Sequence, residues 1–418
     1  MNFNAGDRVR LRLAKDEIEG IFIDNPDSEI VLLKLDSGYN IGIKKENILG
    51  SRILKKFVED KQKVKIKQNE NLPKIGMIVT GGTIAAKLNS KTGGVSWLTD
   101  LNEFQKFYPE IFEIANVKKI EVPFMTSSEA MDWQHWEKIA RKAEELLNDS
   151  EIKGIVITHG TDFLHYTASA LSFFFKKLGK PVVLTYSQRS IDRASSDARL
   201  NLKCAARMAL SDVAEVMLVG HADNNDDFCY AMRGTKVRKL HSSRRDAFRS
   251  VNEMPIAKVW EDRYEILSEY KKRTDIKSGL DSEYSDKVAL VKFYPGQDSS
   301  ILDFYALKYK GVVIEVGGLG HLPVSEAGHN WIPKLKKYIK QGLIVCAAAQ
   351  TVNGRLDPYV YSNGRELVEA GVIFLEDMLA ETAFVKLGWV LGHYGWKKDV
   401  EKKMLENVAG EFNDRLLN

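Results

Sequence analysis

The sequence has 418 residues, well above the ~150 residues of a typical domain, so we expect two or three domains. Hydrophobic residues make up 44% and charged residues 28%, which excludes collagen-like, disulfide-scaffold and wholly disordered chains. The 61 basic and 57 acidic residues leave a net charge of +4, too balanced for a surface covered by nucleic acid. Any basic surface must therefore be local.

The cysteines and the N-terminus indicate the compartment. Cys204, Cys229 and Cys346 are an odd, widely spaced set without a C-x-x-C pair, which argues against a disulfide framework and a zinc ribbon. The first ten residues carry charges where a secretory leader is apolar, and no run reaches ~18 uncharged apolar residues. We expect a cytoplasmic protein with no membrane segment.

Short β-branched runs separated by turn clusters occupy the first 50 residues. They are Val9–Leu13, Gly20–Ile23, Ile30–Leu35 and Tyr39–Ile43. This spacing predicts a small antiparallel barrel or meander, which we assign to residues 1–70. Residues 51–74 carry lysines at positions 55, 56, 61, 63, 65 and 67 and are interpreted as a basic connector or, equally, as a merely solvated linker or strand face.

From Ile75 onward, apolar runs alternate with helical patterns. The apolar runs Ile75–Val79, Gly154–Thr158, Pro181–Thr185 and Glu215–Gly220 predict buried parallel strands, and Asp132–Leu147 and Leu164–Leu178 predict helices. This order predicts an α/β domain over residues 71–278, with ligands bound beyond the carboxyl ends of its strands.

A second set of apolar runs follows the charged stretch Glu261–Asp286. It consists of Val288–Phe293, Gly311–Val316, Leu343–Ala349 and Val372–Leu375. These runs predict a smaller α/β domain over residues 279–418.

Polar clusters follow two of the predicted strands. Thr80–Ala85 contains two glycines that permit a close backbone approach and the hydroxyl of Thr83, a candidate nucleophile. Thr158–Asp162 places the Thr161 hydroxyl and the Asp162 carboxylate after a second strand. These residues could simply cap the helices that follow. Hydrolysis of an amide would explain both clusters, because a threonine nucleophile needs a base or a cation such as lysine.

Motifs of other chemistries are absent. The sequence contains no dinucleotide-binding fingerprint, phosphate-binding loop, zincin motif or serine-hydrolase elbow. The eight histidines show no ligand spacing, so we predict no metal.

The two clusters Thr80-Gly81-Gly82-Thr83-Ile84-Ala85 and His159-Gly160-Thr161-Asp162 resemble the two signatures of the L-asparaginase family. Within that family, three further segments resemble the D subunits of archaeal glutamyl-tRNA(Gln) amidotransferases. These segments are Lys34–Ile43, Arg233–Lys239 together with Ser242–Ser250, and Glu376–Ala383. The resemblance implies an asparaginase-like core of two parallel-sheet domains preceded by a small all-β barrel, a module that simple asparaginases lack.

The same resemblance implies roles for particular residues. Thr83 would attack the side-chain amide, while Thr161, Asp162 and Lys239 would relay protons. Ser128 would bind the substrate α-carboxylate, Glu129 would lie near the α-amino group, and Gly82 and Gly160 would line the substrate site. The Ser-rich turn at Ser128 could equally be an N-cap for the helix predicted at Asp132–Leu147.

Partners also follow from the resemblance. The chain would release ammonia from asparagine or glutamine for a GatE-type kinase and transamidase subunit, which would hold Glu-tRNA(Gln) and use ATP and magnesium. This chain would need no cofactor and would form a homodimer within an α2β2 heterotetramer. The alternatives are a free-standing L-asparaginase and a catalytically silent subunit for assembly or tRNA contact.

Two departures from the family pattern bear on activity. Family members usually carry a tyrosine in the mobile loop after the first signature, but Lys87–Gly94 has none and Ser90 stands about where it would fall. Tyr186-Ser187 replaces the usual Gly-Ala before Gln-Arg. Slow turnover, or turnover only after a partner closes the site, would be compatible with both.

The segment Arg233–Arg249, called the basic run below, has seven Arg or Lys residues against one acid. One interpretation is docking to the partner subunit or to tRNA phosphates. The other is a solvated hairpin that carries one catalytic lysine.

Overall fold

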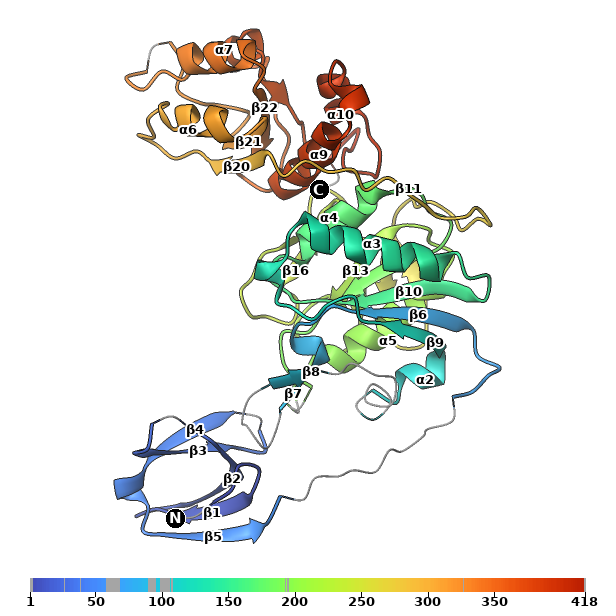
Figure 1. The fold of residues 1–418 in the computed structure, drawn as a ribbon, viewed down its shortest axis with the longest axis vertical. Coiled ribbons are helices and arrows are strands. Elements are labelled where there is room, and N and C mark those ends of the chain that lie inside the picture. The colour runs from blue at the N-terminus through green and yellow to red at the C-terminus, as the bar shows by residue number, and fades with distance from the viewer. Residues whose placement is uncertain are drawn as a thin grey trace.

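The computed structural model of the protein describes residues 3–25, 27–37, 39–57, 68–88, 95–97, 106, 108–191, 193, 195–325 and 327–416. Figure 1 shows three bodies in chain order: a small N-terminal β domain, a large α/β domain and a smaller α/β domain. Four of the connector lysines, at positions 61, 63, 65 and 67, lie outside the described residues, as does Ser90. No helix in the described ranges is both long and apolar enough to cross a membrane.

The N-terminal domain is an antiparallel sheet of five strands in the order β4-β3-β2-β1-β5. Its curvature gives it a barrel-like shape (Figure 1). Alternate residues point inward and form a small core of Val9, Leu11, Val31, Leu33 and Ile43. The strands are β1 (Arg8–Arg12), β2 (Glu17–Ile23), β3 (Ile30–Lys34), β4 (Asn40–Lys44) and β5 (Gly50–Lys55).

Strand β5 corrects the interpretation of residues 51–74 as a connector throughout. It pairs with β1 and packs Ile53 against the core, while Arg52 and Lys55 face outward. The strand was not predicted because polar residues dominate the composition of this segment. Beyond the sheet, the Arg193 guanidinium of the large domain lies 5.3 Å from the ring centroid of Tyr39.

The large domain is built on an eight-stranded sheet in the order β18-β17-β14-β13-β12-β10-β6-β9. Strands β6, β10, β12 and β13 are parallel, as predicted, and β9, which was not predicted, is parallel to β6 at one edge. Strands β14, β17 and β18 continue the sheet antiparallel. The bounds are β6 (Lys74–Val79), β9 (Asn116–Glu121), β10 (Ile152–Thr158), β12 (Val182–Thr185), β13 (Val216–His221), β14 (Cys229–Arg233), β17 (Ala257–Val259) and β18 (Tyr264–Ile266). The charged stretch Glu261–Asp286 contains β18.

Helices cover both faces of this sheet (Figure 1). Helices α3 (Trp133–Leu147) and α4 (Leu164–Phe174) share one hydrophobic core, and α2 (Ile111–Ile114) and α5 (Ala198–Ala209) share the other. Helix α4 ends earlier than predicted, because residues beyond Phe174 form β11 (Phe175–Lys177), which pairs with β19 (Gly279–Leu280). A short hairpin of β7 (Ala86–Leu88) and β8 (Val95–Trp97) follows the first signature.

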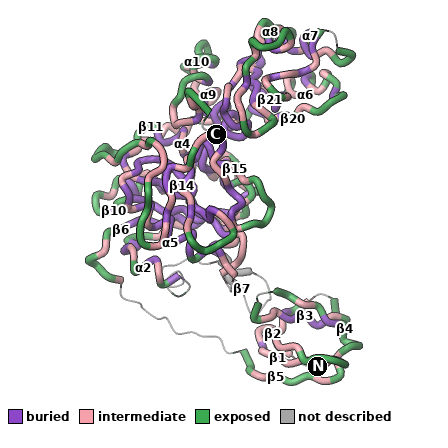
Figure 2. The backbone as a smooth tube through the Cα atoms, turned by 180° about the vertical axis from the view of Figure 1, so that it is seen from behind, coloured by how far each residue is buried: buried purple, intermediate pink, exposed green. Residues whose placement is uncertain are grey.

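The small domain has a parallel sheet in the order β20-β21-β22-β23, as predicted. Its helix α9 packs against α4 of the large domain, so one core runs through both domains (Figure 2). The elements are β20 (Val288–Lys292), α6 (Ile301–Lys308), β21 (Gly311–Val316), α7 (Ile332–Lys340), β22 (Ile344–Ala349), α8 (Ser362–Glu369), β23 (Ile373–Phe374), α9 (Ala380–Gly392) and α10 (Val400–Leu405).

The connection between the domains lies directly on α9. Tyr284 stacks on Trp133 of α3, and its ring occupies the space where a Cβ on Gly388 of α9 would stand, 2.2 Å from Cζ. The amide of Ser285 donates to the Gly388 carbonyl at 2.9 Å. Glycine at position 388 thus permits the connection to pack flat against the helix.

The basic run forms a hairpin of β15 (Val237–Lys239) and β16 (Phe248–Ser250). Each of its seven cations is paired with a carboxylate, while the docking interpretation and the solvated-hairpin interpretation both stay predictions. The pairs are Arg233–Glu215, Lys236–Asp377, Arg238–Glu381, Lys239–Asp162, Arg244–Asp246, Arg245–Asp226 and Arg249–Asp246. The pairs made by Lys236 and Arg238 join the hairpin to the small domain.

Glu253, just beyond this hairpin, predicts a dependence of stability on pH. Burial raises the pKa of Glu253 to about 7 from 4.5, although Arg233 lies 3.4 Å away and Lys236 is near. The protonated carboxyl therefore favours folding: its contribution is complete below pH 4.5 and is lost as the pH rises through 7. Relative to Glu253→Gln, which stays neutral, the wild type should lose roughly 3 kcal/mol across this range.

Urea unfolding of both proteins from pH 4.5 to 8 measures this effect. The unfolding midpoint of the wild type should fall relative to that of the variant as the pH rises. A difference that does not change with pH would contradict the assignment.

Candidate active site

The two signatures meet at the carboxyl ends of neighbouring parallel strands. Strands β6 and β10 end at Val79 and Thr158, and both the amide and the hydroxyl of Thr80 donate to the Thr158 carbonyl, at 3.2 and 2.9 Å. A Cβ on Gly82 would lie 2.5 Å from the amide nitrogen of Gly160. Gly82 also has φ +80°, a conformation that favours glycine. The two signatures are thus in direct backbone contact.

Thr83 begins a single 3-10 turn, Thr83–Ala85, immediately after this contact. Strand β7 follows this turn directly, so Thr83 does not cap a longer helix there, as the alternative proposed. Its hydroxyl has no hydrogen-bond partner among the described residues. Thr83 itself is half-buried.

Thr161, Asp162 and Lys239 form a compact polar cluster. Lys239 Nζ donates to Thr161 Oγ1 at 2.9 Å and to Asp162 Oδ1 at 2.7 Å. The side chain of Lys239 is 9% exposed, whereas that of Asp162 is 63% exposed. Helix α4 starts after Phe163 without a side-chain cap, so Thr161 and Asp162 do not cap it. The side chains of this signature are used to hold the ammonium group of Lys239.

Ser128 lies on the other side of Gly160. A Cβ on Gly160 would be 3.2 Å from Cβ, N and Oγ of Ser128, and Ser128 Oγ accepts a hydrogen bond from the Phe163 amide at 3.3 Å. The N-cap of α3 is Asp132, which forms a capping box with His135. The interpretation of Ser128 as the cap of that helix is therefore wrong.

Two cavities flank the start of α4. One of about 400 Å³ contains Ser128 and Glu129, and one of about 480 Å³ contains Asp162 and Lys239. Both are lined by Phe163 and Tyr166. These aromatic residues were not identified from the sequence, because at helical spacing they look like ordinary core residues.

His159 is part of the second signature but supports it rather than titrating. Burial lowers the pKa of His159 to about 4, so its ring is neutral at pH 7. Nδ1 lies 2.7 Å from the Gly160 carbonyl and therefore donates to it, while Nε2 accepts from the Thr167 hydroxyl at 2.9 Å. This side chain fixes the peptide that Gly82 contacts.

Within the ranges that the structure describes, no three His, Cys, Asp or Glu residues are grouped to hold a metal ion. The site as described consists of a threonine hydroxyl, a threonine–aspartate–lysine cluster and a serine beside a glutamate. Hydroxyl, carboxylate and ammonium groups are those that a covalent hydrolysis and its proton transfers use.

Family models match nearly the whole chain. A model described as Asparaginase, N-terminal matches residues 74–272, one for the Glutaminase/Asparaginase C-terminal domain matches residues 287–404, and one for the GatD N-terminal domain matches residues 3–53. The solved thermostable L-asparaginase from Thermococcus kodakarensis is similar with a TM-score of 0.72 and 30% identity, over 81% of this chain and 99% of that one.

Curated relatives match over a still larger share. The D subunit of the glutamyl-tRNA(Gln) amidotransferase from Pyrococcus furiosus is 46% identical over 97% of this chain and 94% of its own length. The protein of the same name from Methanococcus maripaludis is 41% identical over 98% of both chains.

The fold and the paired signatures define an asparaginase-type protein. More narrowly, the chain belongs to the family of glutamyl-tRNA(Gln) amidotransferase D subunits. The fold class and family expected from the sequence are thereby confirmed.

The contact between the signatures can be tested with two matched glycine substitutions. Gly82→Ala adds a Cβ that collides with the Gly160 backbone, whereas Gly296 has a similar φ of +84° and open space around it. Gly82→Ala should therefore lower amide-hydrolysing activity by roughly 100-fold, because displaced reacting groups lose rate steeply. Gly296→Ala should retain the activity of the wild type.

Ammonia release by the two variants under identical conditions measures the difference. Equal activities would show that the contact is not needed.

Proposed function

We propose that this chain is the ammonia-generating subunit of an enzyme that converts Glu-tRNA(Gln) to Gln-tRNA(Gln). The observation that carries the proposal is the bonding of Lys239 to Thr161 and Asp162, next to the Gly82–Gly160 contact that positions Thr83. The family of D subunits supports the link to tRNA-dependent amidation.

In the proposed reaction, Thr83 Oγ1 attacks the side-chain amide carbon of asparagine or glutamine. The proton of Thr83 passes to the relay of Thr161, Asp162 and Lys239, and the relay returns a proton to the departing nitrogen as the C–N bond breaks. Water then hydrolyses the acyl-enzyme, so one amide and one water give one acid and one ammonia. Lys239 suits this task because its ammonium group is nearly buried and already donates to Thr161.

Substrate binding is assigned to the other side of the site. Ser128 would take the α-carboxylate and Glu129 the α-amino group, while Gly82 and Gly160 let the substrate approach the backbone closely. The cavity of about 400 Å³ beside Ser128 and Glu129 supports this assignment.

The remaining chemistry is proposed to belong to a GatE-type partner. That subunit would bind Glu-tRNA(Gln), activate its glutamate with ATP and magnesium and receive the ammonia, and this chain would contribute no cofactor. Because Asp162 is 63% exposed in the single chain, we expect another chain to cover the site. This fits a homodimer within an α2β2 heterotetramer.

A free-standing L-asparaginase is the alternative, and the likeness to the Thermococcus enzyme favours it. The domain at residues 3–53 argues against it, because it lies outside both asparaginase models and matches the D-subunit model.

The test is ammonia release from asparagine and from glutamine by the chain alone and with a co-expressed GatE-type partner. Thr83→Ala and Lys239→Ala should each lower the rate at least ~100-fold, the scale for loss of a nucleophile or its proton relay. Thr351→Ala and Lys74→Ala are matched controls, since both residues lie outside the site and Lys74 pairs with the exposed Glu151.

Formation of Gln-tRNA(Gln) with ATP and magnesium separates the two candidates. Dependence on the partner supports the amidotransferase role, whereas full asparagine hydrolysis without any association at micromolar concentration supports the free enzyme. If no combination hydrolyses either amide, the result supports the alternative of a catalytically silent subunit.

A further inference from the structure

The lysine of the cluster lies at the end of a short hairpin whose loop faces solvent. Lys239 is the last residue of β15 and lies opposite Phe248, the first residue of β16. Residues 240–244 of the loop are exposed. The position of the ammonium group therefore depends on what holds the hairpin end in place.

Tyr186 contacts the hairpin through both its hydroxyl and its ring. Its hydroxyl donates to the Arg245 carbonyl at 2.8 Å, and its ring lies 4.6 Å from that of Phe248, between centroids. Tyr186 is fully buried, and burial raises its pKa, so the hydroxyl keeps its proton. A Cβ on Gly220 would lie 2.3 Å from the Tyr186 ring, so the ring fits only because residue 220 is glycine.

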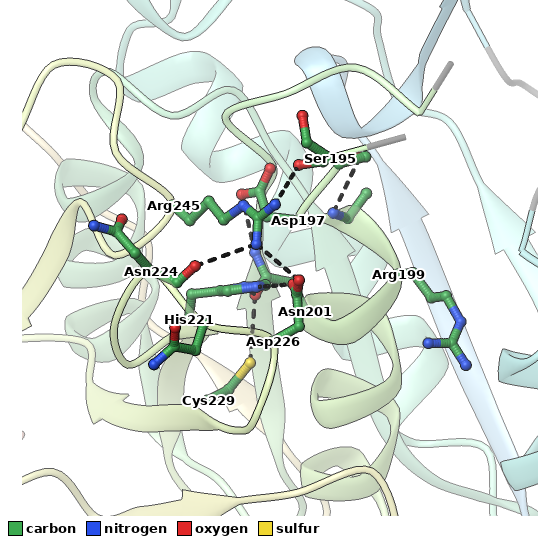
Figure 3. A network of polar contacts seen from close by, with 12 residues as sticks. Ser195, Asp197, Arg199, Asn201, His221, Asn224, Asp226, Cys229 and Arg245 are labelled. Atoms are coloured by element: carbon green, nitrogen blue, oxygen red, sulfur yellow. Dashed lines mark hydrogen bonds and ion pairs between the residues drawn. The ribbon is translucent and has the colours of Figure 1, made fainter. Parts of the chain in front are cut away.

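Arg245 ties the same loop to two other segments of the large domain (Figure 3). Its guanidinium donates to Asp226 Oδ2 at 2.8 Å, to the Asn224 carbonyl at 3.3 Å and to the Ser195 carbonyl at 2.9 Å. The guanidinium group is thus shared among three partners, a geometry that an ammonium group cannot reproduce.

Asp226, the anionic partner of Arg245, also contacts a buried histidine. His221 Nε2 lies 3.0 Å from Asp226 Oδ1, and His221 Nδ1 lies 2.6 Å from Asn201 Oδ1 (Figure 3). The Asn201 side chain donates to the Tyr186 carbonyl at 2.9 Å. The two supports of the hairpin, Tyr186 and Arg245, are therefore connected to each other through the buried Asn201 and His221 and the exposed carboxylate of Asp226.

We propose that Tyr186 and Arg245 are positioning residues that hold the hairpin so that Lys239 reaches Thr161 and Asp162. This inference rests on the proposed function, in which Lys239 relays protons. Neither residue touches the cluster itself: Tyr186 acts through Phe248 and the Arg245 carbonyl, and the Arg245 side chain acts through the loops that it joins. The replacement of Gly-Ala by Tyr186-Ser187 thus supplies a support for the hairpin.

Tyr186→Phe and Arg245→Lys test the inference in whichever form of the protein, alone or with its partner, hydrolyses the amide. Tyr186→Phe keeps the ring and removes the hydrogen bond to the Arg245 carbonyl. Arg245→Lys keeps the positive charge but cannot reproduce the guanidinium contacts with Asp226, Asn224 and Ser195. Each should lower kcat about 10- to 100-fold, because small displacements of a reacting group are costly. KM should stay within about 2-fold, since the substrate-binding residues are untouched.

Tyr270→Phe is the matched control, because Tyr270 also donates one hydrogen bond, to Asp212, and lies outside the hairpin supports. Its kcat should equal that of the wild type. If both hairpin variants keep the wild-type kcat while Lys239→Ala is inactive, the inference is overturned. A rise in KM at constant kcat, or an equal loss of kcat in Tyr270→Phe, would overturn it as well.

The activity of Lys239→Ala distinguishes failure of the proposed relay from failure of the positioning role alone. If Lys239→Ala is as active as the wild type, the result contradicts the proposed relay. It then contradicts the positioning role as well, because that role acts through Lys239.

Discussion

The site depends first on a steric constraint, the contact between the backbones of Gly82 and Gly160. Neighbouring parallel strands bring their carboxyl ends together, but side chains would normally keep the following turns apart. Without a Cβ, Gly82 lies against the Gly160 peptide, and Ser128 contacts the other side of the same glycine. Thr83 and Thr161, each one residue further on, are therefore fixed relative to one another by the sheet.

The cation of the site is placed by a different part of the fold. Lys239 shares a hairpin with Lys236, which forms a fully buried ion pair with Asp377 of the small domain. Removing one partner of such a pair leaves an uncompensated buried charge, which costs about 3–5 kcal/mol. The hairpin that places Lys239 in the site thus also forms an ion pair with the small domain.

Much of this architecture could be predicted from local patterns, and the failures share one cause. Apolar runs identified the parallel strands, and the order of elements indicated the α/β class. Helix α4 ends early because Phe175–Lys177 pair with Gly279–Leu280, about a hundred residues away, which no local pattern reveals. The signatures located Thr83, Thr161 and Asp162, but Lys239 required a family resemblance. The supports of Lys239 required the fold itself. So did the ion pairs of the basic run with Asp377 and Glu381, which lie far along the chain.

The pairing of the basic run has a consequence for the thermodynamics of nucleic-acid binding. Lysines and arginines strengthen binding at low salt by displacing condensed cations from phosphates, and the affinity then falls steeply as salt is added. Each cation of this run already has a carboxylate partner within the chain. Contact with a phosphate would first require that ion pair to be given up. A contact of the run with tRNA phosphates would therefore release less binding free energy than a contact made by an unpaired cation.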